Sequence, residues 1–356
     1  MPIIDINAIG TRGPRNDISD VAGVMVGHHQ RVEDTWLTGT TVVVPPRGSV
    51  GGVDVRGGGP ATRETDALGP STLVENVDAV CLSGGSGYGL AAADGVMSLL
   101  EDRHIGFRVG PEERHVMPIV PSACLFDIVG GGDFRHRPDA SFGRAALEAA
   151  SSTVLQGTVG AGTGARAGGL KGGIGSASVV LDSGITVGAL VALNSGGNVV
   201  DPQDGVLYGL RYGLPGEFSD IGQPTTSEVE RAQSWLTSPR ARNTVLMVVA
   251  TDAALAKSEA CRVAMTAHDG LARAVTPVHC MTDGDVAFCL ATGSRELPTT
   301  AEPGLLVTSS HRTEQLDRVM AAAANVVTRA VVHAVLRATG SGNIRTYLDL
   351  FPSARG

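Results

Sequence analysis

Lysine is nearly absent from this chain of 356 residues, in which Lys171 and Lys257 stand against 26 arginines. No local run of basic residues compensates, and the net charge of −8, with a pI near 5.6, gives no general attraction to nucleic acid. We therefore expect no nucleic-acid partner. Because the chain has only two lysines, the position of each in the fold is of interest.

Closely spaced cysteines and long apolar runs are missing as well. The five cysteines form no CxxC motif and are typical of reduced, mostly buried thiols of a cytosolic protein: Cys81, Cys124, Cys261, Cys280 and Cys289. The amino-terminal segment has no apolar core of signal-peptide length. The longest apolar stretch, from Leu316 to Leu336, is interrupted by charged and polar residues and is a poor membrane span. We expect a soluble cytoplasmic protein without membrane contact.

Aromatic residues make up 4% of the chain and charged residues 18%, against 42% apolar residues. This composition excludes a disordered or coiled-coil protein, and the length suffices for one large α/β domain or two ordinary ones. The 48 glycines are spread along the chain and predict many tight turns.

Short apolar runs bounded by turn residues predict strands, which dominate the first two-thirds of the chain, and two long helices are expected in the last third. The expected strands are Val24–Val26, Thr40–Val44, Val53–Val55, Ala79–Leu82, residues 116–128, Ser176–Leu181, Ile185–Leu193, Thr244–Thr251 and Val286–Ala291. The expected helices follow Gly84 and cover Asp139–Ala150, Ser227–Leu236, Ala256–Arg273 and Ser310–Ala338. This order favours a layered α/β domain with mixed sheets.

Several familiar motifs fail on inspection. Neither glycine cluster, at residues 85–89 or 160–164, completes a dinucleotide-binding G-x-G-x-x-G. The stretch ending at Lys171 departs from a phosphate loop, and Tyr88 occupies the last glycine of a G-x-S-x-G elbow around Ser86. The nine histidines form no HExxH pair, and the sequence predicts neither a metal nor an organic cofactor.

The junction between Asn243 and Thr244 carries the most informative change of composition. A polar stretch from Arg211 to Arg242 ends there, and a strongly apolar strand begins at the next residue. A threonine at a chain terminus has its own base, because the free α-amine has a pKa of about 8 and lies beside the hydroxyl. Thr244 is thus a candidate nucleophile created by cleavage after Asn243, although a threonine that opens a strand needs no function.

Four further residues can support such a nucleophile. Lys171 lies in a glycine-dense stretch, where a lone ammonium requires partners, but it can equally be a solvated loop lysine. Asn194 can donate to an oxyanion or serve in a turn before Ser-Gly-Gly. Asp283 and Asp285 flank one glycine and can orient an amine and a lysine together, or simply form a turn.

Eight ordered blocks of sequence resemble the L-aminopeptidase/D-esterase family. They are GGSGYGLAAADGV (84–96), IVPSACLFD (119–127), FGRAALEAA (142–150), GARAGGLKGG (164–173), ALNSGGNVVD (192–201), RNTVLMVVATDAAL (242–255), AHDGLARAV (267–275) and TDGDVAFCLATG (282–293). The resemblance runs from about residue 20 to residue 335. Its nearest branch is that of the endo-type nylon-oligomer hydrolases.

This resemblance implies a single domain over residues 1–356 with an αββα sandwich fold similar to that of the N-terminal-nucleophile hydrolases. It also implies self-cleavage into fragments 1–243 and 244–356, a homotetramer of the resulting heterodimers, and a small peptide or amide as substrate. By position, Thr244 matches the family's nucleophile. Lys171, Asn194, Asp283 and Asp285 match the supporting residues of the nylon-hydrolase branch.

One departure from the family pattern affects the expected activity. Several members carry a tyrosine where this chain has Phe126, so a phenolic donor to the oxyanion is missing. Two alternatives to an amide hydrolase stay open at this point. One is an acyltransferase of the ornithine-acetyltransferase type, and the other is a non-catalytic member of the family.

Overall fold

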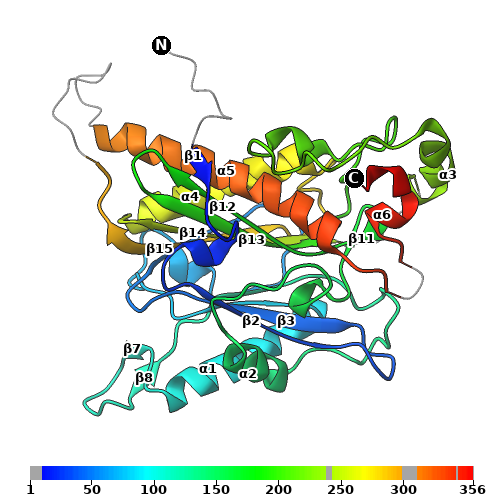
Figure 1. Cartoon of the computed structure of the whole chain (residues 1–356). Helices are drawn as coiled ribbons and strands as arrows, with labels where there is room; N and C mark the ends of the chain where they lie inside the picture. Colours follow the sequence, from blue (N-terminus) through cyan, green and yellow to red (C-terminus); the bar gives the residue numbers. More distant parts are fainter. Residues whose placement is uncertain (1–9, 238–242, 299–310, 342–343, 356) are drawn as a thin grey trace.

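The computed structural model describes residues 10–237, 243–298, 311–341 and 344–355, which form a four-layered α/β structure. Two sheets face each other, and each carries a pair of helices on its outer side (Figure 1). The αββα sandwich expected from the sequence is confirmed. The described part of the Asn243–Thr244 region begins at Asn243, because residues 238–242 lie outside the described ranges.

The larger sheet has six strands and contains the strand that begins at Thr244. Its strand order is β1 (Gly10–Arg12), β12 (Gly173–Leu181), β13 (Thr186–Asn194), β14 (Thr244–Ala253), β15 (Val286–Arg295) and β4 (Val50–Val55). All neighbouring pairs are antiparallel except β14 and β15, which are parallel. A central strand therefore begins at Thr244.

The smaller sheet has five strands, in the order β2 (Met25–Arg31), β3 (Thr38–Val44), β6 (Val80–Ser83), β9 (Ser122–Cys124) and β5 (Thr62–Arg63). Two short ribbons accompany the sheets: β7 (Phe107–Arg108) with β8 (Val116–Met117), and β10 (Arg166–Ala167) with β11 (Leu170–Lys171). The single strand expected over residues 116–128 is wrong. Pro118 and Pro121 cannot donate to a sheet, and only β8 and β9 form there.

Helices cover the outer face of each sheet. The larger sheet carries α4 (Lys257–Ala274) and α5 (His311–Arg337), and the smaller one carries α1 (Ala92–Asp102) and α2 (Ala140–Glu148). Two shorter helices, α3 (Thr226–Leu236) and α6 (Tyr347–Leu350), lie at one end. α5 has the length and hydropathy of a membrane span, but 72% of its apolar window is buried inside the molecule, as in a core helix.

The alternation of side chains along β14 shows how the layers are held. Val245, Met247 and Val249 pack toward the helices, whereas Leu246 and Val248 pack toward the smaller sheet. Burial of each such side chain contributes about 1.5–3 kcal/mol, so the strand is fixed from both faces. Thr244 shares the face of Leu246 and Val248, and its side chain therefore points to the edge of the space between the sheets.

Candidate active site

Thr244 and Asn194 lie directly opposite each other on neighbouring strands. The register of β13 against β14 pairs them, and both side chains are buried, with 5% and 1% of their surface exposed. Residues that are paired across two strands have their side chains on the same face of the sheet. The expected nucleophile and the expected oxyanion donor are thus brought together by the sheet itself.

The amide of Asn194 is held in one orientation. Its Oδ1 accepts a hydrogen bond from the backbone N–H of Arg166 at 2.9 Å, so its Nδ2 must point the other way. Nδ2 donates to the carbonyl oxygen of Phe126 at 3.2 Å. An N–H donor of Asn194 therefore faces the side of Phe126, which lines the same pocket as Thr244.

The peptide bond between Asn243 and Thr244 lies against Gly284. The backbone N–H of Gly284 donates to the carbonyl oxygen of Asn243 at 3.1 Å. A Cβ atom on Gly284 would stand only 2.6 Å from Oγ1 of Thr244, so a side chain here would collide with the hydroxyl. Only a glycine lets this backbone approach both the carbonyl and the hydroxyl.

The two aspartates on either side of Gly284 hold different parts of the backbone. Oδ1 of Asp285 accepts from the N–H of Val245 at 2.8 Å, immediately after Thr244. Oδ2 of Asp283 accepts from the N–H of Cys280 at 2.8 Å. Burial raises the pKa of Asp283, and the nearby charge of Asp285 adds to this effect. Asp285 thus fixes the start of β14, and Asp283 fixes the turn that carries Gly284, the residue that contacts the junction.

Lys171 is fully buried, but its ammonium group is engaged elsewhere. Nζ donates to three backbone carbonyl oxygens, those of Gly162 at 2.8 Å, Ala165 at 3.0 Å and Gly172 at 2.9 Å. Burial lowers the pKa of Lys171 to about 7, and the Asp127 carboxylate opposes this shift. The interpretation of Lys171 as a solvated loop lysine is wrong, because its side chain has no exposed surface.

None of the hydrogen bonds described for Lys171 reaches Asp283, Asp285 or Thr244. Instead, Lys171 holds the turn that carries Arg166, whose N–H orients Asn194. Four of the five expected site residues therefore meet around the Asn243–Thr244 junction. Lys171 is linked to them indirectly, because it binds the backbone of the turn whose Arg166 N–H holds Asn194.

A pocket of about 280 Å³ opens beside Thr244. It is lined by Gly59, Ala61, Ser86, Cys124, Phe126, Thr244, Met281 and Thr282. Ser86 has φ +54°, a left-handed conformation that serine rarely adopts, and such strain clusters at functional sites. The side chains of this lining are small or apolar and carry no charge.

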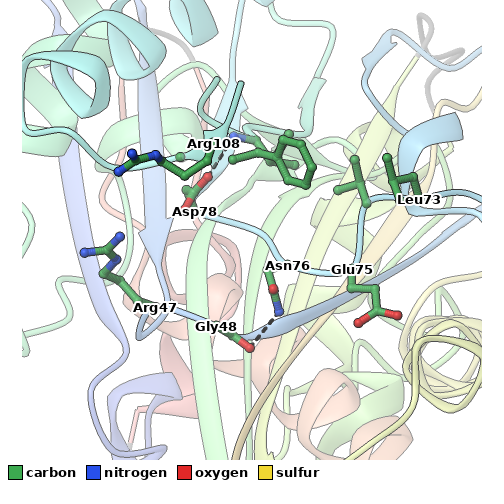
Figure 2. A pocket seen from close by; sticks show the side chains of 11 residues that line it. Arg47, Gly48, Leu73, Glu75, Asn76, Asp78 and Arg108 are labelled. Atoms are coloured by element: carbon green, nitrogen blue, oxygen red, sulfur yellow. Dashed lines mark hydrogen bonds between the residues drawn. The ribbon is translucent and has the colours of Figure 1, made fainter. Parts of the chain in front are cut away.

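A larger pocket, of about 490 Å³, lies elsewhere and contains none of the expected site residues. Figure 2 shows its lining, in which the guanidinium groups of Arg47 and Arg108 extend toward the same side of the view. Asn76 is tied to the carbonyl oxygen of Gly48 at 2.8 Å. No serine, threonine or cysteine lines this larger pocket, whereas Thr244 lines the smaller one, which is therefore the candidate active site.

Two residues near the site were not found from the sequence. Asp127 is buried and accepts from the hydroxyl of Thr38 at 2.6 Å and from the N–H of Gly85 at 2.7 Å, next to Ser86. Burial raises the pKa of Asp127 to about 6. His279 donates to Asp285. Asp127 ends the block IVPSACLFD (119–127), but nothing in that block marks the residue as part of a site, and His279 lies outside every block.

Comparisons with solved structures agree with the fold. A β-aminopeptidase from Burkholderia sp. superposes with a TM-score of 0.71 at 24% identity, covering 99% of each chain. The L-aminopeptidase D-Ala-esterase/amidase from Ochrobactrum anthropi, described as a variant of the Ntn hydrolase fold, gives a TM-score of 0.69 at 24% identity, over 97% of this chain and 96% of that one. The chain therefore has the Ntn hydrolase type of fold.

Sequence comparisons extend this likeness to the family. An uncharacterized aminopeptidase of Mycobacterium tuberculosis is 47% identical over 352 residues, covering 96% of this chain and 99% of the relative. A 6-aminohexanoate-oligomer endohydrolase of Paenarthrobacter ureafaciens is 31% identical over 312 residues, or 81% of this chain and 82% of the relative. The model of peptidase family S58 matches residues 16–346. The chain is a peptide hydrolase that belongs to peptidase family S58.

Proposed function

We propose that the chain cleaves itself between Asn243 and Thr244 and that the new amino-terminal Thr244 is the nucleophile of an aminopeptidase or amidase. The observation that carries this proposal is the geometry of the junction. The hydroxyl of Thr244 lies beside Gly284, whose N–H donates to the carbonyl oxygen of Asn243 at 3.1 Å. A donor on the scissile carbonyl is the arrangement that stabilises an oxyanion.

Self-cleavage then follows as an N-to-O acyl shift. Oγ1 of Thr244 attacks the carbonyl carbon of Asn243, and the negative charge that develops on the oxygen is stabilised by the N–H of Gly284. The C–N bond breaks, the hydroxyl proton passes to the departing nitrogen, and an ester joins Asn243 to Thr244. Water hydrolyses this ester, which leaves a carboxylate on Asn243 and a free α-amine on Thr244.

Turnover uses the same threonine with its own amine as the base. The α-amine takes the hydroxyl proton while Oγ1 attacks the substrate carbonyl, and Nδ2 of Asn194 donates to the oxyanion in place of its bond to Phe126. The amine then protonates the leaving group, and water hydrolyses the threonyl ester. Asp285 fixes the backbone that follows Thr244, and Asp283 fixes the turn that carries Gly284. Lys171 fixes the turn that orients Asn194.

The substrate in this proposal is a small peptide or amide. Relatives are named for peptides and for oligomers of 6-aminohexanoate, and the uncharged lining of the pocket suits an uncharged side chain or methylene chain beside the scissile bond. We further propose a cytoplasmic enzyme that assembles as a homotetramer of heterodimers. The chemistry needs neither a metal nor an organic cofactor.

The experiment is a comparison of the wild-type chain with Thr244→Ala by intact mass and by hydrolysis of a panel of amino-acid amides and peptides. The wild type should give fragments of 243 and 113 residues (356 − 243 = 113) and release acid without an added acceptor. Thr244→Ala should stay whole, folded and inactive, because it loses the nucleophilic hydroxyl together with one methyl group and adds no volume to the packed site. A variant that still hydrolyses amides would place the nucleophile elsewhere, with Ser86 next to test. Acyl transfer only to an added amine would instead identify an acyltransferase.

A further inference from the structure

His279 is bound to Asp285 through two of its own atoms. Its backbone N–H and its ring Nδ1 both approach Oδ2 of Asp285, at 3.2 Å and 2.8 Å. The other oxygen of the carboxylate, Oδ1, accepts from the N–H of Val245 at 2.8 Å. One short chain of hydrogen bonds therefore runs from His279 through Asp285 to the residue that follows Thr244.

The backbone of His279 is itself unusual. Its φ is +57°, in the left-handed region where Asn, Asp and His are the most frequent residues after glycine. Strain of this kind persists only where surrounding contacts hold the residue in place. The left-handed turn directs both the N–H and the ring of His279 to the same carboxylate oxygen, which an extended residue would not do.

The ring of His279 is also fixed on its far side. His268, fully buried in α4, meets it edge to face with 4.8 Å between the ring centroids. Nε2 of His268 approaches the carbonyl oxygen of Asp54 at 3.1 Å, and burial lowers the pKa of His268, which keeps that ring uncharged. Within the described residues Nε2 of His279 has no hydrogen-bond partner, so Nδ1 is the atom that makes its polar contact.

We infer that His279 is a positioning residue for the nucleophile, and that its Nδ1–H, acting through Asp285, holds Thr244 at the distance that both self-cleavage and turnover require. This inference rests on the proposed role of Thr244. Asp285 can hold the N–H of Val245 firmly only if its carboxylate cannot rotate, and His279 prevents this rotation with two bonds to the opposite oxygen. A displacement of about 1 Å at a reacting atom costs about 100-fold in rate.

The chemistry of the side chain offers a matched pair of substitutions. The amide nitrogen of asparagine is two bonds from Cβ, as Nδ1 of histidine is, so His279→Asn can keep the donor to Asp285. His279→Asp has the same shape but presents an acceptor and a like charge to the carboxylate. Both residues tolerate a left-handed φ, so the two variants differ in the hydrogen bond and the charge and not in backbone strain.

The test measures self-cleavage by intact mass and kcat and KM on one amide substrate for wild type, His279→Asn and His279→Asp. We expect His279→Asn to stay within about threefold of the wild-type kcat, whereas His279→Asp loses about 100-fold in kcat and cleaves itself correspondingly slowly. KM should stay within about threefold in both variants, because His279 does not line the pocket. Thermal melting of each variant in the Thr244→Ala background shows whether it folds.

Equal kcat values for the two folded variants would overturn the inference. A raised KM with an unchanged kcat in His279→Asp would overturn it as well. A low kcat for both variants, with normal melting, would show that the ring and not its Nδ1 donor matters, and would overturn it too. The proposed function fails differently, through activity in Thr244→Ala or an uncleaved but active wild type. The two outcomes can therefore be told apart in the same set of proteins.

Discussion

At the residue scale, Lys171 combines complete burial with three hydrogen bonds to backbone oxygens. A buried ammonium without a carboxylate in direct contact is costly, and this cost appears as a pKa lowered to about 7. The unfolded chain therefore binds more protons at this residue than the folded chain does between about pH 7 and the ordinary lysine pKa of 10.5. The contribution of Lys171 to stability is therefore full above about pH 10.5 and is lost progressively as the pH falls from 10.5 to about 7.

Lys171→Met should reveal this dependence. Methionine fills a similar space, but it leaves the three carbonyl oxygens of Gly162, Ala165 and Gly172 without their donor, so the variant should melt at a lower temperature than wild type. The difference in melting temperature should widen from pH 7 to pH 10, because only wild type gains stability there. Turnover should fall by about 100-fold, because the turn that orients Asn194 loosens. A constant difference across this pH range would contradict the buried, shifted lysine.

Gly284 allows a second prediction at this scale. Its φ lies outside the left-handed region, so Gly284→Ala brings no backbone strain, but its methyl group would stand 2.6 Å from Oγ1 of Thr244. The hydroxyl must rotate away, and we expect a folded protein whose self-cleavage is slowed about 100-fold or more, followed by intact mass over time. Gly87→Ala is the matched control, because its Cβ would meet nothing within 4 Å. Normal cleavage in Gly284→Ala would mean that Thr244 attacks from another rotamer.

At the element scale, the sequence predicts best those segments that are buried on one or two regular faces. The strand at Thr244, the hairpin of β12 and β13, and α5 all have the expected positions within a few residues, because hydrophobic periodicity reports burial directly. Residues 116–128 form an apolar run that predicts one strand, but Pro118 and Pro121 lack the N–H that a continuous strand would donate, so the run is divided into β8 and β9.

The candidate site could be predicted only in part for a related reason. The pairing of Asn194 with Thr244 depends on the register of β13 against β14, which no local pattern specifies. Lys171 and His279 act through contacts made by turns with glycine or left-handed residues, whose paths follow from packing between distant segments. The family resemblance identified Lys171, yet its contacts with carbonyl oxygens became visible only in the folded chain.

At the scale of the whole molecule, the proposed cut would divide the larger sheet between two chains. The fragment that begins at Thr244 would supply β14, β15, α4 and α5, while the other would supply β12 and β13 on one side and β4 on the other. β14 stays hydrogen-bonded to β13 along its length, and α5 packs on β12 and β13. Loss of one peptide bond therefore removes little of what holds the layers together, and the fragments should remain associated.

A buried ionic cluster joins the same two parts of the chain away from the sheet. Arg329 on α5 donates from Nε and from a terminal nitrogen to the two oxygens of Glu217, at 2.6 Å and 2.9 Å, and both side chains are 1% exposed. His333 and Asn16 also contact Glu217, each at 2.8 Å. Burial alone would raise the pKa of Glu217, but the hydrogen bonds from His333 and Arg329 outweigh burial and hold that pKa far below its ordinary value.

Glu217→Gln should therefore destabilise the molecule by about 3–5 kcal/mol, since it leaves the guanidinium of Arg329 buried without its counter-charge. Urea unfolding in the uncleaved Thr244→Ala background measures this loss on a single chain. The control is Glu33→Gln, which removes an exposed ion pair with Arg31 and should not change the free energy of unfolding measurably. A carboxyl group whose folded pKa is depressed stabilises the protein above its ordinary pKa of 4.5, and this contribution is lost as the pH falls below it. The difference in free energy of unfolding between wild type and Glu217→Gln should thus be largest at pH 7 and should decrease toward pH 3. A difference that does not change with pH would show that Glu217 stabilises the protein through packing and not through its charge.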